Sequence, residues 1–93
     1  MSVLILGGNY CMTRQYKNIC KIYGCKGKVF THMEKGLRHR IGNPDIIVLF
    51  TSTASHQLAA CAYDGAKQSG AVLEFCHTSS ASALENLLDR FVG

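Results

Sequence analysis

Three of the four histidines in this chain lie at the same kind of position. His32 closes an apolar run at 29–32, His56 follows the run 46–50 after a short Thr/Ser bridge, and His77 closes the run 72–77. If these runs are parallel strands, the three imidazoles lie along the carboxyl edge of one sheet, where open α/β sheets bind their ligands. A neutral imidazole is the form that binds metal ions. The spacing therefore predicts a ligand site at this edge.

The three histidines are not equivalent. Ser55 is a good N-cap candidate, so His56 should lie in the first turn of a helix, where the helix N-terminus disfavours a positive charge. We expect His56 to be the main metal ligand and His32 the second, because its strand should lie beside the first strand. His77 should lie farther out. A surface histidine beside an ordinary cap is the alternative for His56, since a histidine pair alone is a weak metal signal.

A second group of residues suits an anion. Gly7, Gly8 and Asn9 follow the first apolar run, where glycines allow a phosphate or carboxylate to approach the backbone. Hydroxyls of Ser52 and Ser55 at the start of the next helix, and of Ser79 in a later loop, would add hydrogen bonds. The dinucleotide fingerprint lacks its third glycine and there is no Walker motif. The alternatives are a tight turn for the glycines and helix capping for the serines.

The elements that must position these residues alternate along the chain. Strands are predicted at 3–6, 28–32, 45–51 and 71–76, and helices at 11–23 and 55–69, with a short helix or turn within 33–41. A last helix carries Leu84, Leu87, Leu88 and Phe91 on one face, capped by Ser80 or by a capping box of Ser82 and Glu85. This alternation predicts a parallel sheet in the order 2-1-3-4 within one three-layer α/β domain over 1–93, Rossmann-like or flavodoxin-like.

Composition limits the possible functions. The net charge of +4 is mild, so it favours an anionic ligand but makes nucleic acid an unlikely partner. Five cysteines without a C-x-x-C spacing indicate reduced thiols and a cytoplasmic protein, and no apolar stretch is long enough for a membrane span. The sequence contains no paired carboxylates of the kind that catalyse hydrolysis. We therefore expect a binding protein and not an enzyme. A chain of 93 residues would gain stability from forming a homo-oligomer.

The same features resemble a bacterial family known as domain of unknown function 2325. The resemblance rests on Gly7-Gly8, Tyr16, His32, Ser55-His56, Lys67, Gly70 and Ser79-Ser80, and it spans nearly the whole chain. The chain departs from the family after His32, where Met33-Glu34-Lys35-Gly36 replaces the usual Asp-Gly-Gly. The resemblance implies a small Rossmann-like domain that binds haem and oxygen.

Three functions follow from these residues and this resemblance. The first is a sensor domain that holds haem through His56 or His32, with Tyr10, Met12, Phe30, Phe50 and Leu58 as the apolar wall and a dimer enclosing the cofactor. The second is a nucleotide- or phosphate-binding regulatory module without a metal, built on the glycine turn. The third is an assembly module whose site is vestigial.

Overall fold

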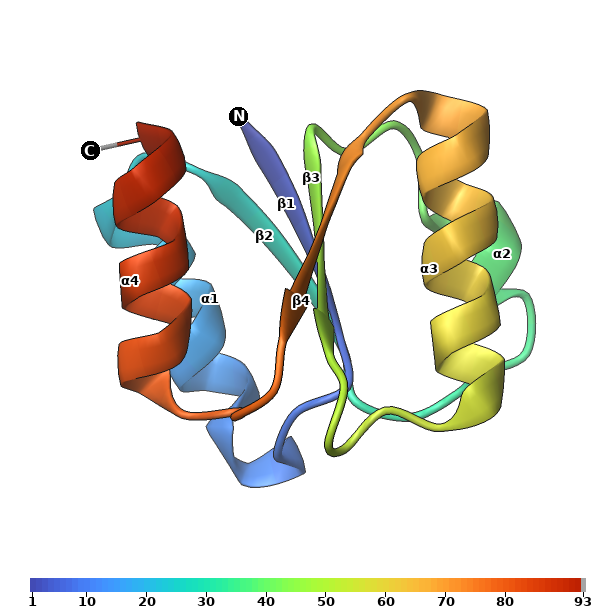
Figure 1. Ribbon diagram of the computed structural model, residues 1–93, viewed down its shortest axis with the longest axis horizontal. Coiled ribbons are helices and arrows are strands. Elements are labelled where there is room, and N and C mark those ends of the chain that lie inside the picture. Colours follow the sequence, from blue (N-terminus) through green and yellow to red (C-terminus); the bar gives the residue numbers. More distant parts are fainter. Residues whose placement is uncertain (93) are drawn as a thin grey trace.

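The computed structural model describes residues 1–92 and has one parallel four-stranded sheet at its centre (Figure 1). The strands are β1 (Ser2–Leu6), β2 (Lys26–Phe30), β3 (Ile46–Phe50) and β4 (Val72–Cys76). They lie in the order β2-β1-β3-β4, which confirms the order expected from the sequence. From β1 the chain adds β2 on one side and then β3 and β4 on the other, so the strand order switches between β1 and β3. In this topology the crevice at the carboxyl ends of these two strands is the expected ligand position.

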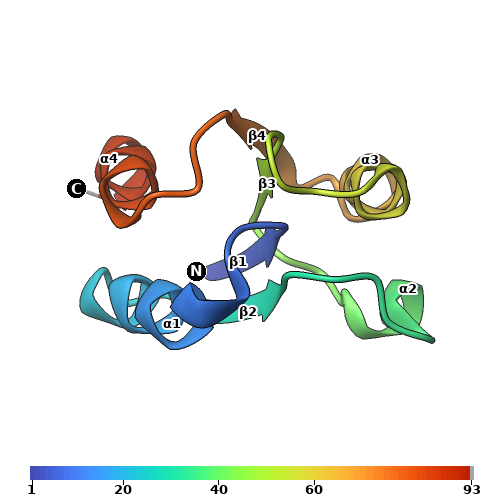
Figure 2. The same cartoon turned by 90° about the horizontal axis from the view of Figure 1, so that it is seen from below.

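Helices cover both faces of the sheet. The short 3-10 turn η1 (Tyr10–Met12) leads into α1 (Thr13–Ile22), which lies beside α4 (Ala81–Val92) on one face. The other face is covered by α3 (His56–Ser69) and the single-turn α2 (Leu37–Arg40). Figure 2 looks onto the carboxyl edge and shows these three layers, with two helices on either side of the strands. Within residues 1–92, no helix is long and apolar enough to span a membrane.

The central strands bury side chains on both faces, because each face has its own core. Val3 and Ile5 of β1 pack with α1 and α4, whereas Leu4 and Leu6 pack with α2 and α3. All five residues of β3 are buried, as a continuous apolar run between two helical layers requires. This double burial holds the carboxyl ends of β1 and β3 side by side.

Strand β2 begins and ends two residues earlier than the sequence indicated. The predicted range 28–32 is wrong because pairing to β1 starts at Lys26, whose N–H donates to the Met1 carbonyl at 2.9 Å. Gly27 fits there because a Cβ at this position would lie 3.0 Å from the Cys20 side chain. His32 is consequently in the loop after the strand and not at its last position.

The helix starts are set by single side chains. Ser55 caps α3, since its Oγ accepts the Leu58 N–H at 3.2 Å, as expected. For α4 the capping residue is Ser80, whose Oγ accepts the Ala83 N–H at 3.2 Å. The alternative capping box of Ser82 and Glu85 is therefore wrong.

The buried thiol of Cys20 makes stability depend on pH. Burial, and next the neighbouring Cys25, raise the pKa of Cys20 from 9.0 to about 11. The unfolded chain therefore loses this proton at lower pH than the folded protein does. The contribution of the protonated Cys20 thiol to the free energy of unfolding is fully present below pH 9. It falls by roughly 2–3 kcal/mol as the pH rises to about 11.

We therefore expect the free energy of urea unfolding to fall between pH 9 and 11, and Cys20→Ala to remove this part of the slope. The exposed Cys11 offers a matched control. A slope that is the same in Cys20→Ala and Cys11→Ala would contradict the assignment.

Candidate functional site

The carboxyl edge of the sheet is held together by Tyr16. This residue of α1 is fully buried, and its hydroxyl donates to the Ser79 carbonyl at 2.5 Å and accepts the Asn9 N–H at 3.2 Å. Gly8 makes room for the ring, since a Cβ there would lie 2.8 Å from a ring carbon of Tyr16. Tyr16 thus fixes the loop after β1 against the loop after β4.

The backbone donors of the glycine turn are already engaged. Gly7 donates its N–H to the Phe30 carbonyl at 2.9 Å, and Gly8 donates to Thr53 Oγ1 at 2.7 Å. The Asn9 N–H is bound to Tyr16, and its side-chain oxygen accepts the Cys11 N–H at 3.0 Å. These bonds count against a phosphate cradle made by the turn itself. A role for Gly7, Gly8 and Asn9 in binding a ligand stays a prediction.

The serines at this edge act mainly on the protein's own backbone. Ser55 and Ser80 cap helices, and the carbonyl of Ser79 accepts from Tyr16. Ser52 is exposed in the turn after β3. The predicted ligand contacts of Ser52, Ser55 and Ser79 remain predictions; Ser52 and Ser55 are exposed, and Ser79 is half-buried.

His56 lies at the junction of two surface hollows. The first, which we call the aromatic hollow, has a volume of about 280 Å³, and the Tyr63 and Phe75 rings lie 6.0 Å apart beside it. The second, the charged hollow, has a volume of about 540 Å³, and its charged lining residues are Glu34, Lys35 and Arg38. The aromatic hollow is lined by Leu49, Thr51, Ala54, Ser55, His56, Ala59, Tyr63 and Phe75. His56 itself is exposed in the first turn of α3 and contributes to both hollows.

His32 has a different neighbour. It is exposed, and its ring stacks near Tyr10 with centroids 6.1 Å apart. Within residues 1–92, no three His, Cys, Asp or Glu side chains gather closely enough to hold a metal ion. A metal held only by several side chains is therefore not supported, whereas a haem iron needs a single axial ligand from the protein.

The apolar wall expected from the sequence is wrong in most of its members. Phe50 and Leu58 are buried at 0% and 1% exposure, and Phe30 at 7%, so all three belong to the cores. The walls beside His56 are instead Tyr63 and Phe75, which are half exposed. Helical spacing could have identified Tyr63, because a residue seven positions after His56 lies two turns farther along the same helix face.

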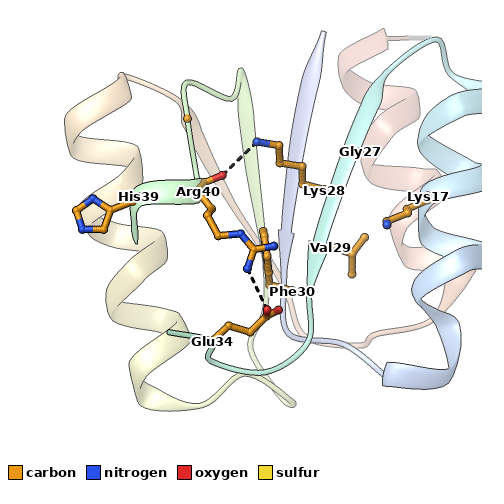
Figure 3. Close-up of a pocket in the computed structure, with 9 residues that line it drawn as sticks. Lys17, Gly27, Lys28, Val29, Phe30, Glu34, His39 and Arg40 are labelled. Atoms are coloured by element: carbon orange, nitrogen blue, oxygen red, sulfur yellow. Dashed lines mark hydrogen bonds and ion pairs between the residues drawn. The ribbon is translucent and has the colours of Figure 1, made fainter. Parts of the chain in front are cut away.

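A third hollow, of about 590 Å³, lies along the outer edge of β2 and is rich in cations (Figure 3). Its basic side chains are partly satisfied within the protein: Lys28 donates to the Arg40 carbonyl at 3.1 Å, and Arg40 pairs with Glu34 at 3.1 Å. The Arg40 guanidinium also lies 5.1 Å above the Phe30 ring. Lys17 approaches from the α1 side. The sequence pattern does not reveal this hollow, because its cations come from three separate elements.

The fit between Tyr16 and Gly8 can be tested by adding one methyl group. Gly8→Ala places a Cβ against Tyr16 at a φ of +89°, so we expect a loss of about 2–5 kcal/mol in the free energy of unfolding. Gly24→Ala is a matched control, since its φ is +73° but nothing lies within 4 Å, and it should cost about 1 kcal/mol. Urea denaturation of both variants measures the difference, and equal losses would contradict the contact.

Comparison with known proteins places the chain in a family. The family model described as "Uncharacterized protein conserved in bacteria (DUF2325)" matches residues 2–91. No curated protein and no solved structure matches the chain. Because the match covers nearly every residue of the sheet and of the helices around it, the chain belongs to this bacterial family, domain of unknown function 2325.

Proposed function

We propose that this protein is a non-enzymatic binding or sensor domain that holds a flat, largely apolar and anionic cofactor beside His56. Haem is the cofactor of this kind that the chain suits best. The observation that supports the proposal is the position of His56 between an aromatic hollow and a hollow that is lined by two cations and by Glu34, whose carboxylate is paired with Arg40. The arrangement lies at the carboxyl edge, where this fold binds its ligands.

The residues present fit the three requirements of a haem site. An axial ligand is available from the exposed imidazole of His56, and Tyr63 and Phe75 offer aromatic faces to the macrocycle. Lys35 and Arg38 lie on the opposite side of His56, where they would pair with the two propionates. Arg38 already binds Asp64, whereas Lys35 takes part in no ion pair within residues 1–92. Lys35 is therefore the cation most available to the ligand.

Each group has a separate role in this proposal. His56 would hold the iron, the aromatic hollow would contact one face of the ring, and the charged hollow would orient the acidic edge. Bound haem would supply reversible oxygen binding, which makes a sensor the natural function. His32 is the second candidate ligand, on the loop after β2. The five free cysteines support a cytoplasmic location, where thiols stay reduced.

A nucleotide- or phosphate-binding module remains the alternative. Its support is weaker because the N–H groups of Gly7, Gly8 and Asn9 are engaged within the protein. Thermal shift with a panel of nucleotides separates it from the haem proposal, since only the alternative predicts stabilisation by nucleotides in a colourless protein.

Hemin titration followed by absorbance tests the proposed ligand. We expect a Soret band in the wild-type protein, at least a ten-fold weaker affinity in His56→Ala, since losing one iron ligand removes well over about 1.4 kcal/mol, and partial recovery on adding free imidazole. His77→Ala is the matched control, because His77 is also exposed at a strand end but lies after the outermost strand. An unchanged band in His56→Ala would rule out His56 as the ligand, and no band in the wild type would rule out haem.

A further inference from the structure

The outer edge of β4 exposes apolar side chains on a strand that has a neighbour on one side only. β4 is the last strand of the sheet and lies between α3 and α4 in Figure 2. Val72 and Phe75 of this strand are 47% and 51% exposed, and Tyr63 of α3, which packs near Phe75, is 54% exposed. We call these three residues together with the outer side of β4 the open edge.

The backbone of β4 presents free hydrogen-bonding groups at this edge. Toward β3, the Val72 N–H donates to the Asp45 carbonyl at 3.0 Å, and the Cys76 carbonyl accepts the Thr51 N–H at 2.9 Å. In a parallel strand, alternate residues direct both of their backbone groups to the same side. The N–H and C=O groups of Leu73 and Phe75 therefore point away from β3, ready to pair with another strand.

The opposite edge of the sheet, β2, is protected by positive charges against pairing with a second copy of the chain. This contrast favours β4 as the edge that pairs. β2 has the sequence Lys-Gly-Lys-Val-Phe, and Lys17 and Arg40 lie beside it, so a second copy of the chain would meet like charges there. β4 has the sequence Val-Leu-Glu-Phe-Cys, with neither lysine nor proline. Its one charge, Glu74, lies 4.0 Å from Arg90, so the open edge is close to neutral and suits its own copy.

We propose that two copies of this chain associate through the open edge, with their β4 strands antiparallel about a two-fold axis. The two four-stranded sheets then become one continuous sheet, and the apolar groups of both edges leave water. Pairing centred on Glu74 would oppose two carboxylates, whereas pairing centred on Phe75 sets one aromatic ring against the partner's Phe75. Both registers pair the outward backbone groups of Leu73 and Phe75, so the side chains decide between them, and the register of the dimer is the one centred on Phe75.

The dimer bears directly on the aromatic hollow. Tyr63 and Phe75 line both this hollow and the open edge, so a second copy placed there covers the side of the hollow that faces solvent. The cavity beside His56 is then completed by the partner subunit. The association itself depends only on the strand and its side chains, and it holds whichever ligand binds.

Mass measurement on the ligand-free full chain tests this interface. Light scattering after size exclusion should give twice 10.2 kDa for the wild type. Phe75→Lys places a charge at the centre of the interface and should halve the mass. Ile22→Lys is the matched control, because Ile22 is 81% exposed but lies at the end of α1, and it should leave the dimer intact.

Circular dichroism of each variant establishes that it is folded, and Tyr63→Lys replaces Phe75→Lys if the latter does not fold. The mass is measured over a series of protein concentrations. A wild-type protein that is monomeric at all of them would overturn the proposal. A dimer that persists in a folded Phe75→Lys or Tyr63→Lys protein would also overturn it, since the copies would then meet elsewhere. Hemin binding is measured separately, so failure of the dimer and failure of the proposed cofactor give different results.

Discussion

The contact of Tyr16 with Gly8 is the constraint on which the arrangement of the carboxyl edge of the sheet depends. A buried phenol in a small domain needs partners for its hydroxyl, and here those partners are the backbone of two different loops. Gly8 continues the connection, since its N–H binds Thr53 in the turn that precedes α3. Three loops at the carboxyl edge are thereby tied to each other, and α3 starts at a defined position with His56 in its first turn.

This constraint also explains how the protein uses its glycine turn. In many folds of this class such a turn holds a phosphate through its N–H groups. In this chain the same groups bind Phe30, Thr53 and Tyr16, so the turn serves the internal structure. The surface that we propose for a ligand is therefore His56, with the aromatic and charged hollows on its two sides.

Much of the fold could be predicted from the sequence, because the strongest patterns belong to the buried elements. The continuous apolar runs of β1 and β3 indicated a parallel sheet, and Ser55 marked the start of α3. The limits of β2 could not be predicted. Lys26 and Gly27 carry no apolar signal, and they belong to the strand because they pair with β1, with Gly27 also lying close to the Cys20 side chain.

The candidate site was harder to predict than the fold. Phe30 and Phe50 lie at strand ends, which suggested that they would line the ligand site. Both side chains instead pack into the hydrophobic cores. Tyr63 and Phe75, which do flank His56, come from a helix face and an outer strand whose proximity follows from tertiary packing. Sequence spacing predicted a candidate site at the carboxyl edge of the sheet, and the three-dimensional arrangement shows which side chains lie beside His56 there.

We propose that a ligand binds beside His56. Amide chemical shifts recorded during titration with zinc protoporphyrin, a diamagnetic analogue of haem, test this most directly. We predict that the changes are largest at His56, Ala59, Tyr63 and Phe75, with smaller changes at Lys35. Changes concentrated at Lys17, Lys28 and Arg40 on the β2 edge, or no changes at all, would contradict it.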